Sequence, residues 1–234
     1  MLLACSSLLR PHAAPRSSVV ACAAGLEAEL LRLQPGSPGV RQEVARLTSA
    51  LAESVGVENP ALSPLIEGEW VLIHTSSSSF DIRNPLGRRS DGSAPGLEGA
   101  FQAVTGGARI ELPSSSPIQR AVVEAFSVTQ SIRLQGGGAK RVDQCVDTPL
   151  GTLKLGARAS VTPEAPRRIS FAFDEGYFDL REPVLGVSRI PYPAPFKLLG
   201  KEAEGFLDTE YLSEQLRVSV GNKGTRFVLR RSYT

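Results

Sequence analysis

The chain has 234 residues, of which 41% are hydrophobic, and its formal net charge is +2. This length predicts one or two domains with one sizeable core. The near-neutral charge gives no basis for the basic face of a nucleic-acid-binding protein, and no apolar run approaches the ~18 residues of a membrane-spanning helix. The 22 glycines and 17 prolines indicate many turns rather than long helices.

The first part of the chain, residues 1–24, has the composition of a targeting sequence. It contains no Asp or Glu, it is rich in Ser and Ala, and the first acidic residue is Glu27. Leaders of this kind are typical of organellar transit peptides. Pro11 and Arg16 interrupt the apolar core that a secretory signal needs. We therefore predict a chloroplast transit peptide over residues 1–24, ahead of a mitochondrial leader and a secretory signal.

Residues 25–58 carry a helical pattern. Helix-forming residues fill 26–33, the prolines and glycines of 35–39 interrupt them, and the helical pattern resumes over 41–54. In the second stretch the apolar residues recur at helical spacing and leave a polar back. These apolar positions are Val44, Leu47 and Leu51. We expect a short N-terminal helical segment here, ahead of a second domain over 59–234.

From Gly68 onward the apolar period changes from helical spacing to two, which predicts strands. The clearest case is 153–161, where apolar residues alternate strictly with Lys154, Gly156, Arg158 and Ser160. Nine or ten strands are expected, at 70–75, 97–104, 109–112, 119–130, 142–146, 153–161, 169–173, 206–212, 215–220 and 225–231.

No helical pattern interrupts this series of strands, so the sheet should be mostly antiparallel. A meander of this many strands tends to close on itself, because open edges expose unpaired backbone. The predicted fold is therefore a mainly β, antiparallel barrel whose interior can hold one small ligand. Two long stretches with little regular pattern, 76–96 and 184–205, are predicted loops, and loops of this length are usually functional or disordered.

Three segments resemble the plastid lipid-associated protein (fibrillin) family. They are Asn59-Pro-Ala-Leu-Ser-Pro with the Gly-Glu-Trp that starts at Gly68, the Pro-Tyr-Pro-Ala-Pro-Phe loop within 190–200, and the closing strands around Gly-Asn-Lys-Gly at 221–224. The resemblance spans about 26–231 and is strongest after residue 190. Val220 stands where the family commonly has Arg before that turn, and His74 stands where it commonly has Tyr.

The resemblance implies a lipocalin-like barrel and a non-enzymatic role at plastid lipids. The expected function is to bind or shelter a hydrophobic molecule (an isoprenoid, quinone, carotenoid or acyl lipid) at plastoglobules or thylakoids, or from the stroma, without a cofactor. The alternative is a structural coat or scaffold with a filled barrel, which binds lipid surfaces or a partner enzyme. Neither reading needs nucleic acid, a metal or a transmembrane segment.

An enzyme using Cys145 or His74 is the third and least favoured reading. Cys5 and Cys22 fall within the predicted leader, which leaves Cys145 as a lone thiol that cannot form an internal disulfide. A half-buried strand residue explains it better than a nucleophile, because nothing in the sequence pairs it with His74.

Two sets of residues are candidate lipid contacts. The barrel lining is predicted from inward strand positions and comprises Leu72, Phe101, Phe126, Leu155, Phe171, Phe173 and Phe227. The 184–199 loop concentrates apolar side chains beside cations, which suits a lipid headgroup boundary, although it could equally fold back over a barrel end. Its predicted lipid-facing residues are Ile190, Tyr192, Phe196, Lys197, Leu198 and Leu199.

Structural roles are expected for Gly68, Trp70, Arg217, Gly221 and Gly224. In lipocalin-like folds a tryptophan after such a glycine plugs one end and stacks under a cation, for which the candidates are Arg217, Arg226 and Arg230. The Gly221–Gly224 stretch lacks phosphate-loop spacing and predicts a tight hairpin turn instead.

Overall fold

The computed structural model describes residues 16–35, 37–54, 56–76, 127–191, 203–222 and 224–233. The strands predicted at 97–104 and 109–112 lie outside these residues. So do seven of the candidate lipid contacts, namely Phe101, Phe126, Tyr192, Phe196, Lys197, Leu198 and Leu199.

Two helices open the described chain. Helix α1 (Arg16–Arg32) is longer than the predicted helical stretch and begins inside the predicted leader, and helix α2 (Val40–Glu53) follows the predicted stripe closely. Val44, Leu47 and Leu51 are buried as expected. An ion pair between Arg46 and Glu29, with an N···O distance of 2.9 Å, links the two helices. None of the described helices is long and apolar enough to span a membrane.

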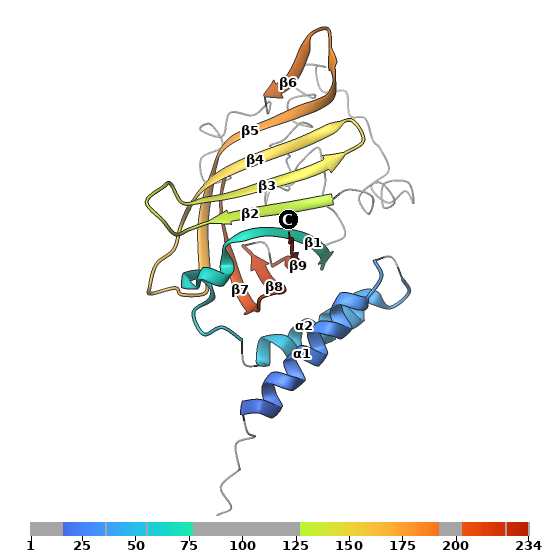
Figure 1. Cartoon of the computed structure of the whole chain (residues 1–234), viewed down its shortest axis with the longest axis vertical. Coiled ribbons are helices and arrows are strands. Elements are labelled where there is room, and N and C mark those ends of the chain that lie inside the picture. Colours follow the sequence, from blue (N-terminus) through green and yellow to red (C-terminus); the bar gives the residue numbers. More distant parts are fainter. Residues whose placement is uncertain are drawn as a thin grey trace, which may run out of the picture.

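Two 3₁₀ turns, η1 (Pro60–Leu62) and η2 (Pro64–Ile66), lead into an antiparallel sheet. In the described chain the sheet comprises β1 (Gly68–Thr75), β2 (Ser127–Arg133), β3 (Arg141–Thr148), β4 (Gly151–Ser160), β5 (Arg168–Val184), β6 (Val187–Pro191), β7 (Glu204–Leu212), β8 (Leu216–Gly221) and β9 (Arg226–Arg231). The neighbours run β4-β3-β2-β1-β9-β8-β7-β5, and a further β4–β5 pairing closes the eight strands into a ring. The predicted mainly β, antiparallel and barrel-like fold with an N-terminal helical segment is confirmed (Figure 1).

The prediction of a loop over 184–205 is wrong for the first part of this range. Strand β5 continues to Val184, turns through Leu185 and Gly186, and pairs with β6 up to Pro191. Both turn residues have positive φ, 52° and 80°, which is the backbone twist that a two-residue hairpin turn requires. The hairpin projects from the ring at the top of Figure 1. We call this end of the ring the hairpin end.

The inner face of the ring is packed at the opposite end, which we call the Trp70 end. Trp70 is fully buried, and its indole Nε1 donates a hydrogen bond to the carbonyl oxygen of Ile66 at 2.9 Å. It belongs to a cluster of buried side chains from the 3₁₀ turns and from several strands, namely Ala61, Ile66, Ile132, Leu134, Val142, Ile169, Leu212 and Leu229. The 3₁₀ turns therefore cover this end, and Trp70 fills it.

The outer face of β7–β9 carries a second apolar cluster, because the helices pack against it. Tyr211, Leu216, Val218 and Val228 bury their side chains against apolar positions of the two helices. Those helix positions are Leu30, Val44, Leu47 and Leu51. In Figure 1 both helices lie together on this side of the strands. The N-terminal helical segment thus belongs to the packing of the ring.

We expect Trp70→Ala to lower the free energy of unfolding by about 3–5 kcal/mol, because it leaves a large cavity at the packed end and an unpaired carbonyl at Ile66. Urea denaturation followed by far-UV circular dichroism measures this change. Trp70→Phe is the control: it keeps most of the ring and loses the hydrogen bond, so a cost of about 1–2 kcal/mol is expected. A loss below 1 kcal/mol for the alanine variant would contradict the proposed plug.

Candidate functional site

The inner face toward the hairpin end is lined by the described members of the predicted barrel lining. Leu72 and Phe227 pack on the inner cluster. Leu155 is 2% exposed and lies two residues from Ala157, which pairs with the inner residue Val142. Because side chains on one face of a strand recur every second residue, Leu155 shares that inner face.

Phe171 and Phe173 complete this lining from β5. They pair with Ala159 and Ala157 of β4, and their rings meet edge to face with centroids 5.4 Å apart. The Phe171 ring lies over Gly205 of β7, and a Cβ atom added to this glycine would be 2.7 Å from the ring. A side chain at this position would displace the aromatic ring, so glycine is needed there. The prediction that these residues contact a ligand remains a prediction.

Beside Phe171 the wall of the ring is hollowed. An open pocket of about 340 Å³ lies where β5 passes from its pairing with β4 to its pairing with β7. Its lining mixes apolar and polar side chains from the three strands, namely Arg158, Ala159, Ser160, Ser170, Phe171, Ala172 and Glu204.

Arg217 is one of two arginines on the described inner face that contact Trp70. Its side chain is fully buried, and its guanidinium carbon lies 5.2 Å from the centroid of the Trp70 ring. Nη2 donates to the Oε1 atom of Gln130 on β2, across the interior. Nε and Nη1 are buried and have no hydrogen-bond acceptor among the described residues. A cation with unused donors therefore lies next to an otherwise apolar cluster.

Arg231 contacts the same Trp70 ring, and each of its nitrogens has a hydrogen-bond acceptor. Its guanidinium carbon is 4.3 Å from the ring centroid. Its three nitrogens donate to three backbone carbonyls: Nε to Glu214 at 2.7 Å, Nη1 to Glu67 at 2.7 Å, and Nη2 to Leu65. Arg231 therefore ties the start of β1, the turn before it and the β7–β8 turn to one another.

The expected stacking of a cation on Trp70 is present, with one change of partner. Arg217 stacks as predicted, but Arg226 and Arg230 do not, and Arg231 takes their place. Arg226 lies on the outer face, where Nη2 is 3.0 Å from Glu210. The period of two could have identified the right residue, because 227, 229 and 231 share one face of the strand.

Burial and the nearby charge of Arg231 together lower the pKa of Arg217 to about 9. At neutral pH the group therefore stays protonated, and the interior carries a positive charge. No carboxylate contributes to this shift, so the described part of the chain supplies no counter-ion for Arg217.

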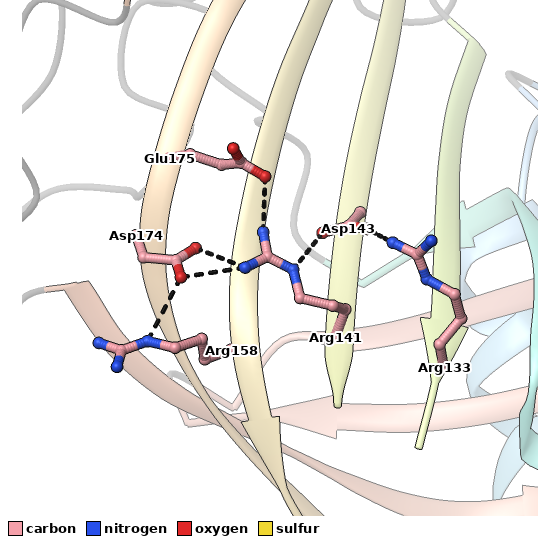
Figure 2. Close-up of polar contacts among 6 residues, drawn as sticks. All are labelled: Arg133, Arg141, Asp143, Arg158, Asp174 and Glu175. Carbon is pink, nitrogen blue, oxygen red and sulfur yellow. Dashed lines mark hydrogen bonds and ion pairs between the residues drawn. The ribbon is translucent and has the colours of Figure 1, made fainter. Parts of the chain in front are cut away.

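The outer face of β2–β5 is charged and internally paired, as Figure 2 shows. Arg141 contacts Asp174 at 3.0 Å, Glu175 at 2.7 Å and Asp143 at 3.3 Å, and Arg158 reaches Asp174 at 3.3 Å. Arg133 pairs with Asp143 from the neighbouring strand. These carboxylates are strand-exterior residues, and each is bound to an arginine.

Cys145 and His74 do not form an activated pair in the structure. Burial raises the pKa of the Cys145 thiol, whereas a reactive cysteine needs a lowered one. Burial lowers the pKa of His74, which lies beside the backbone of Leu33 in the chain that links the helices. The described residues contain no group of three or more His, Cys, Asp or Glu side chains that could hold a metal ion.

The hairpin end exposes several large apolar side chains. Leu185 at the turn is 98% exposed, Leu150 in the β3–β4 turn is 75% exposed, and Val187 and Ile190 of β6 are about half exposed at 48% and 47%. Cations accompany them: Arg189 stacks 4.0 Å over the Tyr177 ring and pairs with Asp179 at 2.6 Å. Ile190 is the one described member of the predicted lipid-facing loop.

The hairpin turn predicted at 221–224 is confirmed. Strands β8 and β9 are joined there, Gly224 has a φ of 74°, and its N–H donates to the carbonyl of Gly221 at 2.8 Å. Gly68, also predicted to be structural, has a φ of 111° at the start of β1. Positive φ angles of this kind favour glycine at both positions.

Comparisons with known proteins point to one family. The family model PAP_fibrillin matches residues 29–230. The probable plastid-lipid-associated protein 12, chloroplastic, of Arabidopsis thaliana is 35% identical over 206 residues, which are 86% of this chain and 41% of that relative. The chain therefore spans less than half of the relative's length. No solved structure matches the chain significantly.

We expect Arg217→Met to leave the free energy of unfolding unchanged or to raise it by about 1–4 kcal/mol, because it replaces a buried, unpaired charge by an apolar side chain of similar length. Arg231→Met is the matched control on the same aromatic ring. It leaves three carbonyls without donors and should cost at least about 2 kcal/mol. Urea denaturation of both variants measures the difference, and equal destabilisation by the two would refute the distinction drawn between these arginines.

Proposed function

Because the chain belongs to the PAP/fibrillin family, we propose that it is a non-enzymatic plastid protein that binds a hydrophobic molecule inside its ring of strands. The observation that carries this proposal is the set of apolar residues on the inner face, from the packed Trp70 end to Phe171 and Phe173. A ring of eight strands has an interior of the size that holds one small ligand. Apolar binding sites with few polar groups gain their affinity from buried ligand surface.

Three observations support placing this role in the plastid. The chain matches the family model over most of its length, the Arabidopsis relative is described as chloroplastic, and residues 1–24 have the composition of a transit peptide. The ligand classes that suit the lining are isoprenoids, quinones, carotenoids and acyl lipids, all of which are long and mainly apolar.

The same proposal includes peripheral contact with a lipid surface, a plastoglobule or a thylakoid membrane, through the hairpin end. Exposed Leu185, Val187 and Ile190 would enter the lipid boundary while Arg189 lies beside them. The paired charges on the outer face of β2–β5 favour water there and thus favour the hairpin end as the contact.

A second candidate function is a coat or scaffold protein, which binds lipid surfaces or a partner enzyme with a filled interior. The tightly packed cluster around Trp70 favours it, because part of the ring is already filled by side chains. Such a protein would bind vesicles without retaining any internal ligand.

The test of the leading proposal combines ligand recovery and a binding measurement. Protein purified from plastids should retain an apolar molecule that mass spectrometry identifies. Phe171→Ala should weaken binding of that molecule about 10-fold, since a lost aromatic contact is worth roughly 1.5 kcal/mol. Phe206→Ala is the matched control, because Phe206 pairs with Ser170 on the outer face and stacks under Arg168 at 3.7 Å. Recovery of no lipid, or equal loss in both variants, would favour the coat reading.

Docking through the hairpin end predicts that Leu185→Asn lowers the fraction of protein bound to phosphatidylcholine–phosphatidylglycerol vesicles by about 5- to 10-fold, because one buried leucine contributes roughly 1.5 kcal/mol. Asn tolerates the positive φ of this position, so the turn should still form. Tyr233→Ser is the control, since Tyr233 is 73% exposed near the Trp70 end. Vesicle flotation measures both, and an unchanged bound fraction for Leu185→Asn would exclude this contact.

A further inference from the structure

Two arginines contact the same buried tryptophan, and only one of them has its hydrogen bonds satisfied. Arg231 gives all three nitrogens to backbone carbonyls. Arg217, which is 0% exposed, engages only Nη2, with Gln130, and leaves Nε and Nη1 without an acceptor in the described chain. The contacts of Arg231 therefore account for it as a structural group. The contacts of Arg217 do not account for its free Nε and Nη1.

Among the described residues, the polar groups near Arg217 on the inner face do not supply an anion. Gln130 is neutral, and the buried hydroxyls of Thr209 and Ser219 lie 3.2 Å from each other and share a hydrogen bond. Asp208, on the strand next to β8, faces outward and binds Arg168. An unpaired charge in a dry interior is strongly unfavourable unless an opposite charge joins it.

We propose that the ring binds an apolar chain ending in a carboxylate, and that this carboxylate accepts a hydrogen bond from a free nitrogen of Arg217. A hydrogen bond from a guanidinium to a carboxylate is charge-assisted and is about twice as strong as one between neutral groups. This inference rests on the proposed function and names the class of ligand: a free fatty acid or another long-chain acid.

The number of donors favours a carboxylate over a phosphate group. A phosphate monoester carries three strong acceptor oxygens, and binding it in a dry site would need several cations. Each nitrogen of Arg231 donates to a carbonyl, so among the described inner-face cations Arg217 is the one with nitrogens that have no acceptor. One guanidinium neutralises one carboxylate.

The rest of the lining fits the apolar tail. From Arg217, β8 continues through Ser219 to Gly221. The Phe227 ring lies close to Gly221: a Cβ atom added to this glycine would be 3.2 Å from the ring. The four steps along the strand from Arg217 to Gly221 cover about 13 Å, the length of a medium acyl chain. The tail would thus extend from Arg217 toward the hairpin end, past Phe227 and the Phe171–Phe173 pair.

The test uses two probes that differ only in the headgroup, cis-parinaric acid and its methyl ester. Trp70 is the single tryptophan of the chain and contacts Arg217, so energy transfer from Trp70 to the bound polyene reports binding at this place. At neutral pH the wild-type protein should bind the acid about 10- to 100-fold more tightly than the ester, as expected for charge-assisted hydrogen bonds. Arg217→Met should bind both probes with the affinity of the ester.

Arg230→Met is the matched control, because Arg230 is an exposed arginine on the outer face of the neighbouring strand. It should keep the full preference for the acid. If Arg217→Met does not fold, Arg217→Gln replaces it, and the wild-type ratio of acid to ester affinity is decisive without any variant.

The outcomes separate the two proposals. Equal binding of acid and ester by the wild-type protein overturns the carboxylate site but leaves the proposed apolar binding function intact. A preference for the acid that survives Arg217→Met and Arg217→Gln also overturns it, because another cation must then hold the headgroup. Binding of neither probe contradicts the proposed function itself, and the carboxylate site with it.

Discussion

The way Trp70 is held determines much of this structure. Its indole donates to Ile66 and so fixes the 3₁₀ turn that covers one end of the ring. Arg231 stacks on the same ring and binds the carbonyls of Leu65, Glu67 and Glu214, which joins the first strand, the last strand and the β7–β8 turn. First and last strands of a ring must meet for it to close, and this set of contacts lies at their junction.

The outer surface is divided between two kinds of packing. Around β7–β9 the helices bury Tyr211, Leu216 and Val218, so the wall is thick and apolar there. Around β2–β5 the wall faces solvent and is covered by arginine–carboxylate contacts centred on Arg141 (Figure 2). Exposed ion pairs contribute little to stability. Because a charged face is costly to bury in lipid, these pairs favour the hairpin end as the place of the proposed lipid contact.

The strict alternation at 153–161 was enough to predict β4 and its inner face, because a period of two is a direct consequence of strand geometry. Other features depend on tertiary contacts that one strand does not reveal. The β5–β6 hairpin was missed because its turn, Leu185-Gly186, carries a leucine at positive φ, which no turn rule favours. Likewise, nothing local in the sequence distinguishes Arg217 from Arg231, because their difference lies in which carbonyls are within reach.

The difference in hydrogen bonding between Arg217 and Arg231 distinguishes the two ends of the interior. Arg231 lies at the covered end, where backbone carbonyls accept from its nitrogens, whereas Arg217 reaches across the interior to Gln130 and keeps two nitrogens without an acceptor in the described chain. A ligand with a charged head and an apolar tail matches the charged and the apolar regions of the interior only when its head lies beside Arg217 and its tail extends toward Phe171 and the hairpin end. The exposed apolar hairpin residues lie at that same end. In the two proposals taken together, the end that contacts lipid is also the end toward which the tail extends, so a chain drawn from a lipid surface would enter with its head first.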